Sequence, residues 1–292
     1  MPATAQKVAH PQRGATLTPG FPMTMAQTAN PPFAFTRLLK PFETLGAITL
    51  FTFSALGKTV RRPFRIALMT QILEFVGVGS LGIVLLTGVF TGAVFAIQTA
   101  VAFELFNAKT LIGGTVAISL VRELAPSLTA LMVAGRVGSA MTTELGTMRV
   151  TEQIDALETM AVDPIHYLVT PRILACTLMV PLLAMCFNAI GLLGAYIAAT
   201  QVLGIDRGEF FSRIWLWISP HDIACTLVKG TFFGLVIGAV SCYRGFHASG
   251  GSRGVGLATT GTVVTASAAV LIMDYVITSI WLVVFPSQGG LS

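Results

Sequence analysis

Long apolar stretches separated by short polar segments dominate the chain after residue 75. A helix needs about 20 mostly apolar residues to cross a bilayer. Five stretches meet this length, and they predict transmembrane helices at about 79–102, 113–140, 173–203, 223–243 and 256–285. The pattern therefore predicts an all-α, polytopic integral membrane protein.

The segments outside these stretches have different patterns. Residues 41–76 mix apolar side chains with Arg61, Arg62 and Arg65, which is typical of helices that lie in the membrane interface. Residues 1–40 are rich in Pro, Thr and Ala and have no periodicity, so we expect a disordered N-terminal tail. We assign residues 77–286 to one membrane domain and 287–292 to a C-terminal tail.

Composition and charge narrow the class of protein further. The chain is 54% hydrophobic and only 11% charged, against about 25% charged in soluble proteins. This excludes an ordinary soluble enzyme, a disordered protein and a disulfide-rich secreted module. The net charge of +5 comes from a basic N-terminal arm, which favours contact with anionic lipid over nucleic acid.

The distribution of basic residues also predicts an orientation. With five spans, the segments on the N-terminal side of the membrane contain twelve Lys and Arg residues, and those on the other side contain three. Basic residues concentrate on the cytoplasmic side of membrane proteins. We therefore expect a cytoplasmic N-terminus and a C-terminus on the far side.

Glycine recurs at four-residue spacing on two predicted spans. Gly88 and Gly92 lie on the first, and Gly230, Gly234 and Gly238 lie on the fourth. Small residues at this spacing let helices approach closely in lipid. Packing within one chain is the favoured interpretation, and a seam between two copies is the alternative.

Four charged residues fall inside the outer halves of the spans: Arg122, Glu123, Lys229 and Asp274. Their formal charges sum to zero. An ionised group costs about 2.5–3.5 kcal/mol at mid-bilayer on insertion scales, so each needs a partner or a wet cavity. Two interpretations stay open: mutual pairing that stabilises the bundle, or a polar lining near a headgroup-sized cavity. For Arg136, nearer the cytoplasmic end, we expect snorkelling to the interface.

The cytoplasmic loop at 141–172 contains a helical pattern. Four apolar residues form one stripe: Val150, Ile154, Leu157 and Ala161. Three acids lie off the stripe: Glu152, Asp155 and Glu158. We expect one amphipathic helix at about 144–160, which ends before Asp163-Pro164. It could rest on lipid or dock on a soluble partner, and its acidic face favours a partner.

The sequence contains little evidence for a catalytic site. There is no P-loop, and the four histidines form no metal-ligand spacing. We assign no catalytic residue and no metal site. A membrane-embedded lipid-modifying enzyme and a stand-alone secondary transporter remain as alternatives to a transport subunit.

Several motifs point to one family. The stretches Leu86-Thr-Gly-Val-Phe-Thr-Gly, Arg122-Glu-Leu-Ala-Pro, Gly135-Arg-Val-Gly-Ser-Ala, Glu144-Leu-Gly-Thr-Met-Arg-Val-Thr-Glu-Gln-Ile-Asp-Ala-Leu and Gly254-Val-Gly-Leu-Ala-Thr-Thr resemble the MlaE/YrbE-type permease family. The likeness covers about residues 44–285.

The resemblance implies a permease subunit of an ABC-type transporter in the bacterial inner membrane, which moves phospholipid or a related lipid between membranes. It implies a homodimer around a lipid cavity, an ABC ATPase that binds ATP and Mg²⁺, and an MCE-domain lipid-binding protein. It implies no cofactor on this chain. It also makes the helix at 144–160 the ATPase-coupling helix, with these candidate contacts: Glu144, Arg149, Glu152, Gln153, Asp155, Leu157 and Glu158.

A lipid cavity needs an apolar wall for the acyl chains and a few polar groups for the headgroup. The candidates for this cavity are Leu85, Val89, Phe90, Val94, Gln98, Arg122 and Glu123. Arg122 is the candidate phosphate contact, because a guanidinium fork matches phosphate oxygens. Lys229 and Asp274 remain candidates for charged groups inside the membrane.

Overall fold

A computed structural model describes residues 33–58, 66–106, 108 and 111–284. The predicted tails at 1–40 and 287–292 lie largely or entirely outside these residues, as do Arg61, Arg62 and Arg65. Helix α1 (Phe33–Gly57) begins inside the segment that we expected to be disordered. Contacts divide the chain into two units, Met1–Glu43 and Thr44–Ser292, and the second contains all five long apolar helical stretches of the described residues.

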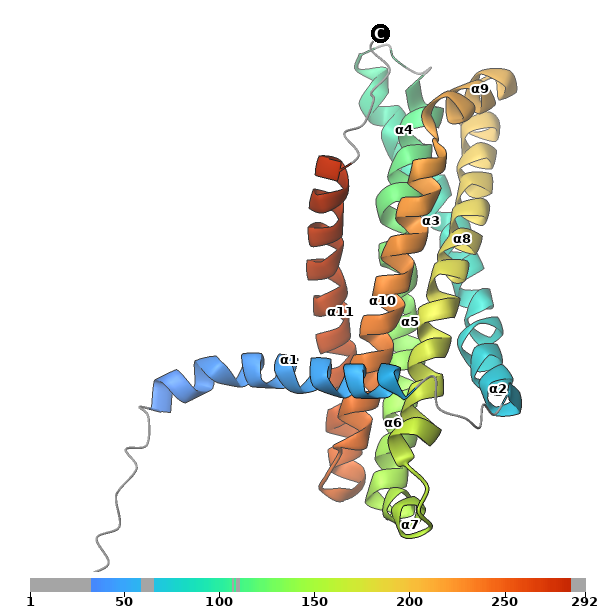
Figure 1. Ribbon diagram of the computed structural model, residues 1–292. Helices are drawn as coiled ribbons and strands as arrows, with labels where there is room; N and C mark the ends of the chain where they lie inside the picture. Colours follow the sequence, from blue (N-terminus) through green and yellow to red (C-terminus); the bar gives the residue numbers. More distant parts are fainter. Residues whose placement is uncertain (1–32, 59–65, 107, 109–110, 285–292) are drawn as a thin grey trace, which may run out of the picture. The chain divides into compact units, whose positions relative to one another are not determined.

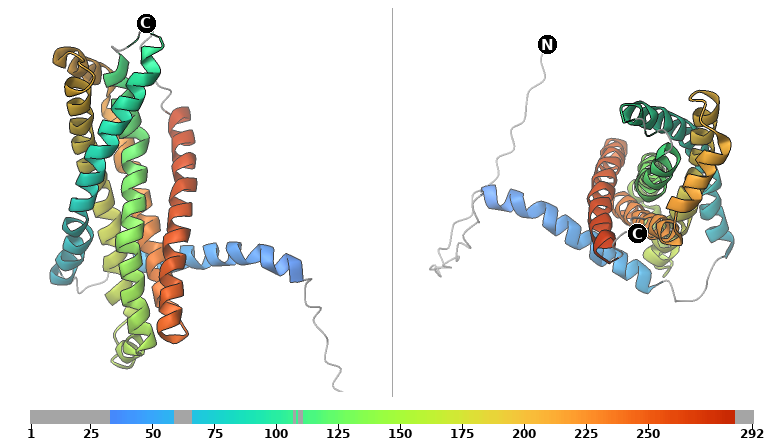
Figure 2. Two further views of the ribbon diagram at one scale, coloured as in Figure 1. Left: turned by 180° about the vertical axis from the view of Figure 1, so that it is seen from behind. Right: turned by 90° about the horizontal axis from the view of Figure 1, so that it is seen from above.

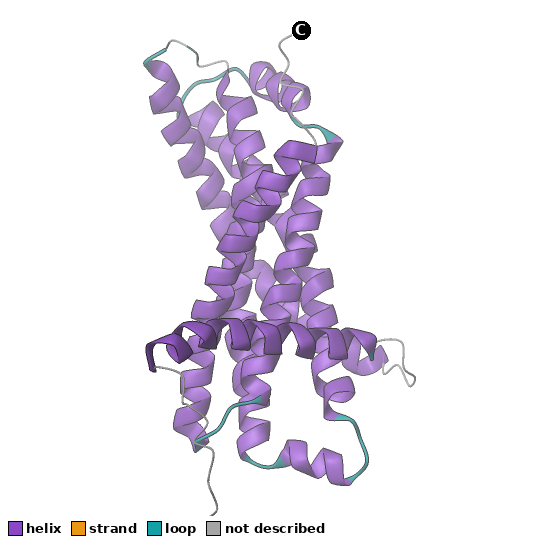
Figure 3. Ribbon diagram, turned by 60° about the vertical axis from the view of Figure 1, so that its left-hand side comes forward, coloured by secondary structure: helices purple, strands orange, loops and turns teal. Residues whose placement is uncertain are grey.

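The part of the chain that the structure describes consists of helices and loops (Figure 3). After α1, the α-helices are α2 (Ile66–Val76), α3 (Val78–Glu104), α4 (Ile112–Ser119), α5 (Ala125–Val133), α6 (Ser139–Val150), α7 (Gln153–Thr159), α8 (Thr170–Gln201), α9 (Arg207–Trp217), α10 (Pro220–Phe246) and α11 (Gly251–Val284). Within the described ranges, π-helical turns interrupt or extend them at η2 (Leu120–Leu124), η3 (Ala134–Gly138) and η4 (Ile165–Val169).

The prediction of five membrane-spanning segments is confirmed. Among the described residues, five helical stretches are long and apolar enough to cross a membrane: Ala67–Glu104, Ile112–Val150, Ile165–Gln201, Pro220–Phe246 and Gly251–Val284. They run alongside one another (Figure 1). The first includes α2, which we expected among the interfacial helices. Only Gly77 separates α2 from α3, so the apolar stretch extends further toward the N-terminus than predicted.

Helix α8 lies at the centre of the packing, and glycine brings α3 against it. A Cβ on Gly92 would lie 1.9 Å from the carbonyl oxygen of Gly191, and one on Gly194 would lie 2.2 Å from that of Val89. Backbone therefore packs on backbone. The intrachain interpretation of Gly88 and Gly92 is confirmed, since both glycines are buried within the single chain.

Helix α10 also packs closely against α8 through glycines, on another side of α8. A Cβ on Gly234 would lie 2.3 Å from the carbonyl oxygen of Cys176, and one on Gly230 would lie 2.6 Å from the Cα of Pro181. The glycine stripe of the fourth span is thus covered inside the chain. In contrast, α11 stands at the edge of the bundle (Figure 2), and little of its span is buried.

One end of the bundle carries the segment between the second and third spans. From Thr44 onward, α1 lies across the bundle near this end. Helix α6 extends past α1 and leads to α7, which lies at the tip (Figure 1). Phe51 of α1 packs against the rings of Tyr243, Phe246 and His247, with centroids 5.7–5.9 Å apart. The hydroxyl of Thr170 also donates to the carbonyl of Ala55 at 3.1 Å. This part of α1 is therefore attached to the start of α8 and the end of α10.

Candidate functional site

A break in the second span positions the first charged residues. Pro126 has no N–H, so the carbonyl of Arg122 loses the donor that a regular α-helix would supply. Arg122 and Glu123 lie just before this proline, in the π-helical turn η2. The Nζ atom of Lys229 donates to the freed Arg122 carbonyl at 3.0 Å. A lysine on α10 thus replaces the missing backbone donor.

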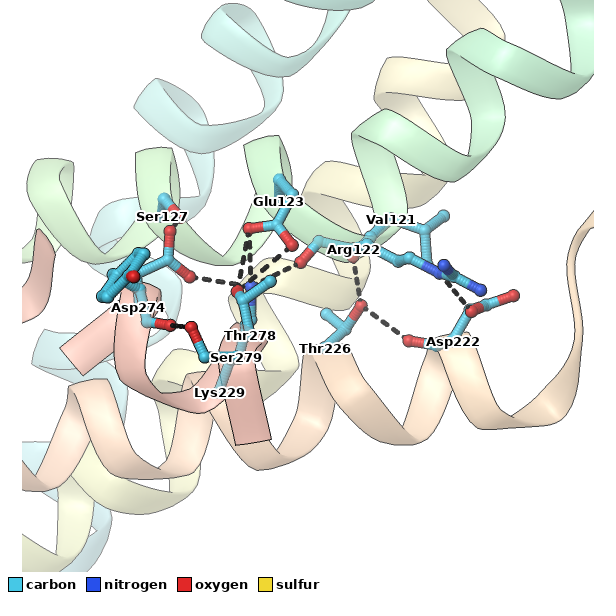
Figure 4. A network of polar contacts seen from close by, with 11 residues as sticks. Val121, Arg122, Glu123, Ser127, Asp222, Thr226, Lys229, Asp274, Thr278 and Ser279 are labelled. Carbon is cyan, nitrogen blue, oxygen red and sulfur yellow. Dashed lines mark hydrogen bonds and ion pairs between the residues drawn. The ribbon is translucent and has the colours of Figure 1, made fainter. Parts of the chain in front are cut away.

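Lys229 also joins two acids from different helices (Figure 4). Its Nζ atom lies 2.7 Å from Oε2 of Glu123 and 2.8 Å from Oδ1 of Asp274. The lysine side chain is fully buried, whereas those of Asp274 and Glu123 are 18% and 43% exposed. The ammonium donates hydrogen bonds to Glu123 and to the Arg122 carbonyl, and Asp274 adds an ion-pair contact. The second, fourth and fifth spans are therefore joined at one charged centre.

Hydroxyl groups also contact the two acids. Ser127 donates to Oδ2 of Asp274 at 2.8 Å, and Thr278 lies 3.3 Å from both carboxylate oxygens of Glu123. Lys229, Glu123 and Asp274 are thus paired with one another, which is one of the two arrangements that the sequence left open.

Arg122 pairs with an acid that the sequence analysis missed. Its Nε atom lies 2.5 Å from Oδ1 of Asp222, whose side chain is only 1% exposed. Asp222 also closes a capping box at the start of α10, because its Oδ2 accepts from the backbone N–H of Ser219 at 2.8 Å. The sequence signal was available, since Ser219 and Asp222 have capping-box spacing. The predicted fourth span began one residue too late to include this acid.

The additional acid corrects the predicted charge balance. With Asp222, the centre contains two cations and three carboxylates, so its formal charge is −1 rather than zero. Nη1 and Nη2 of Arg122 form no hydrogen bond with the residues described, and the side chain is 28% exposed. Arg122 can therefore contact an anion while it stays paired with Asp222.

The candidate lipid-facing residues of α3 divide into two groups. Phe90 and Val94 are 62% and 57% exposed, and Gln98 is also exposed. Leu85 is 37% exposed, whereas Val89 is half-buried where its backbone meets Gly194 of α8. No hydrogen bond or ion pair between described residues joins this face to the charged centre. The structure therefore leaves an exposed apolar face on α3 at Phe90 and Val94.

The coupling segment is two helices rather than the single helix that we predicted at 144–160. Helix α6 ends at Val150, and α7 begins at Gln153. Glu152 between them has a φ of 61°, in the left-handed region that few non-glycine residues adopt. The apolar stripe had the right spacing, but a left-handed residue interrupts the helix within it. Ile154 is buried and Leu157 packs beside it, whereas Ala161 is exposed.

Ion pairs attach this segment to the bundle. Arg149 pairs with Asp155 across the break, and its guanidinium lies 6.0 Å from the ring centroid of Phe246. Glu144 pairs with Arg172 at 2.8 Å. The remaining polar candidates are Glu152, Gln153 and Glu158, and all three are exposed. The segment therefore presents an acidic surface with its apolar side turned inward.

A further pair connects the end of α1 with the loop after α7. The Nζ atom of Lys58 lies 2.5 Å from Oδ2 of Asp163. Partial burial alone would raise the pKa of Asp163. The opposing effects of the Lys58 ammonium and of the backbone N–H groups of Ile165 and His166 are larger together and hold this pKa below its ordinary value. Asp163 is therefore a carboxylate at neutral pH.

These features define the class of protein: an integral membrane protein with an ion-paired centre inside its helices and a charged segment outside them. No group of three or more His, Cys, Asp or Glu among the described residues could hold a metal ion. A family model described as Permease MlaE matches residues 69–280. The chain belongs to the MlaE permease family.

Individual relatives agree with this assignment. The chain is 40% identical over 245 residues to a probable ABC transporter permease protein of Rickettsia conorii, with 84% of this chain and 95% of the relative covered. It is 40% identical over 242 residues to the intermembrane phospholipid transport system permease protein MlaE of Haemophilus influenzae (82% and 92% covered). The chloroplastic protein trigalactosyldiacylglycerol 1 of Arabidopsis thaliana is 40% identical over 210 residues (72% and 60% covered).

Proposed function

We propose that this chain is the permease subunit of an ABC transporter that moves phospholipid between membranes, driven by ATP hydrolysis in a separate ATPase subunit. The observation that carries the proposal is the match to the MlaE permease family over residues 69–280. The names of two relatives agree with it: one is a probable ABC transporter permease and one belongs to an intermembrane phospholipid transport system.

The acidic surface of α7 is the proposed docking site for the ATPase. Its polar side chains point outward while Ile154 is fully buried, so the helix can contact a partner without losing its own packing. Arg149–Asp155 and Glu144–Arg172 attach the segment to α6 and α8. A movement of the docked ATPase would thereby reach two membrane spans.

Charge reversal on this surface tests the docking. Glu152→Lys and Glu158→Lys are suitable variants, because neither acid forms an ion pair with the residues described. Glu209→Lys on α9, at the other end of the bundle (Figure 1), is the matched control. We expect the double variant to lose the ATPase on co-purification and the control to retain it. Retention by the double variant would eliminate this docking surface.

The exposed faces of α3 and α11 suggest how the lipid cavity forms. Two copies that bring these faces together would enclose Phe90, Val94 and Gln98, with Arg122 available for a phosphate oxygen. An MCE-domain protein would accept or deliver the lipid on the far side. Arg122→Ala should lower lipid co-purification and transport, whereas Arg253→Gln on the exposed start of α11 should not. If Arg122→Ala transports lipid at the wild-type rate, Arg122 does not contact the transported lipid.

The same proposal places the protein in a bacterial inner membrane with α7 in the cytoplasm. Glu158→Cys should then be shielded from a membrane-impermeant maleimide in intact cells, and Arg207→Cys on α9 should be labelled. The reverse labelling pattern would overturn the orientation and the ATPase docking together. Lipid transfer or lipid modification by the purified chain alone would instead favour a secondary transporter or an enzyme.

A further inference from the structure

Arg136 is a cation within the second span, in the π-helical turn η3. Its Nη1 atom donates to Oγ of Ser80 at 2.9 Å and to the carbonyl of Phe75 at 3.3 Å. The guanidinium carbon lies 5.5 Å from the ring centroid of Phe75. No carboxylate of the described residues forms a salt bridge with it. The five charged groups of the centre around Lys229 are paired with one another, so Arg136 differs from them in lacking an ion-pair partner among the described residues.

The surroundings of Arg136 hold its guanidinium in one place. Ser80 is only 1% exposed, and it lies just after the break at Gly77 between α2 and α3. Gly79 leaves room for the guanidinium, because a Cβ there would lie 2.7 Å from Nη2 and 3.2 Å from Nη1. Nη1 is the nitrogen that makes both hydrogen bonds. Nη2 and Nε form none with the described residues, so these N–H groups remain available.

The height of this group in the bundle indicates what could bind it. Turn η3 joins α5 to α6, at about the level where the residues of α1 from Thr44 onward lie across the bundle (Figure 1). A helix that lies across the spans fits the membrane–water interface. Arg136 therefore lies near the depth of the lipid headgroups. Beside it, Phe75 and Val78 are 40% and 63% exposed, and they offer apolar surface to an acyl chain.

We propose that Arg136 and Ser80, at the α2–α3 break, form a binding site for the phosphate group of a phospholipid in the leaflet nearest α7. The guanidinium supplies the charge and the N–H fork that match phosphate oxygens. The hydrogen bond from Nη1 to Ser80 holds the guanidinium in place, and the missing Cβ of Gly79 leaves space for it. The site is distinct from the charged centre around Lys229, and it does not depend on the proposed transport function.

Native mass spectrometry of the full chain, released from detergent with added lipid, tests the site. The probes are phosphatidylglycerol and a diacylglycerol with the same acyl chains and no phosphate. We expect phosphatidylglycerol to bind more tightly to the wild-type chain, and Arg136→Gln to lose about tenfold or more of this affinity, the value of a hydrogen bond to a charged group. Arg136→Lys should retain only part of it. Equal binding of both lipids, or of the wild type and Arg136→Gln, would overturn the proposal.

Substitutions at two glycines of α3 distinguish a specific loss of the binding site from a general loss of folding. Gly79→Ala keeps Arg136 but displaces the guanidinium, whereas a Cβ on Gly82 meets nothing within 4 Å. We expect Gly79→Ala to weaken phosphatidylglycerol binding and Gly82→Ala to leave it unchanged. Addition of inorganic phosphate distinguishes the source of the phosphate: lipid that stays bound supports a headgroup site. Complete displacement by millimolar phosphate would assign the site to the free anion and refute the lipid.

Discussion

Replacement of Lys229 with Met tests whether the charged centre stabilises the bundle. The substitution keeps an unbranched apolar side chain but removes an ammonium that is fully buried and has three oxygen atoms at 2.7, 2.8 and 3.0 Å. Asp274 and Glu123 would lose their shared cation. Removal of one partner from a buried ion pair costs about 3–5 kcal/mol, because the other partner stays buried and unpaired.

This cost predicts a large change in thermal stability. For a chain of this size, 1 kcal/mol corresponds to about 2–4 °C, so we expect Lys229→Met to lower the unfolding midpoint by about 6–20 °C. Thermal unfolding of the full chain in detergent, followed by tryptophan fluorescence, measures the shift. Arg253→Gln, which removes an exposed cation at the start of α11, should change the midpoint by less than about 2 °C.

The two acids should contribute unequally. Asp274 is 18% exposed and Glu123 is 43% exposed, and solvent weakens an ion pair. In double-mutant cycles with Lys229→Met, we expect a coupling energy of about 1–3 kcal/mol for Asp274→Asn and less than about 1 kcal/mol for Glu123→Gln. A midpoint for Lys229→Met within about 2 °C of wild type would refute the reasoning. So would stronger coupling to Glu123 than to Asp274.

Three further predictions concern packing, backbone conformation and pH. Gly92→Ala should destabilise the chain by about 1–3 kcal/mol, because its Cβ would lie 1.9 Å from a backbone oxygen, whereas Gly82→Ala should not; equal unfolding midpoints would contradict this. Ala161 has a φ of 57°, so Ala161→Gly should raise stability by up to about 1 kcal/mol, and a lower midpoint would count against strain at this position. The lowered pKa of Asp163 means that its pair with Lys58 contributes stability above about pH 5 and loses it as pH falls through that pKa. Lys58→Gln should therefore cost less than about 1 kcal/mol at pH 7, and this cost should shrink as the pH falls through the pKa of Asp163; a cost that stays unchanged at acid pH would exclude this pair as the cause.

The resemblance and the hydrophobic pattern anticipated the family and the five spans, because length and apolarity alone decide whether a helix can cross a bilayer. Length and apolarity did not give the ends of the spans accurately. The pattern placed α2 outside the first span and began the fourth span after Asp222, since a hydropathy pattern carries no information on how far a helix continues into polar sequence.

The coupling segment shows a second limit. The stripe that includes Ile154 and Leu157 was a correct signal for a buried helical side, and both residues pack inward. The helix break at Glu152 was not predictable from it, because a left-handed conformation at a residue other than glycine is stabilised by the surroundings rather than by the residue's own propensity.

The amino-acid sequence by itself determined the class of structure, the number of spans and the presence of charges that need partners inside them. Only the tertiary structure decided the partners. Lys229 joins residues 106 positions before it and 45 positions after it, and Arg122 meets an acid 100 positions away. The local pattern of apolar and polar residues reflects one helix and the solvent around it. The ion pairs depend on which helices lie side by side and on the depth at which their charged residues meet. Close glycine contacts bring α3 and α10 against α8, and no single helix contains that information.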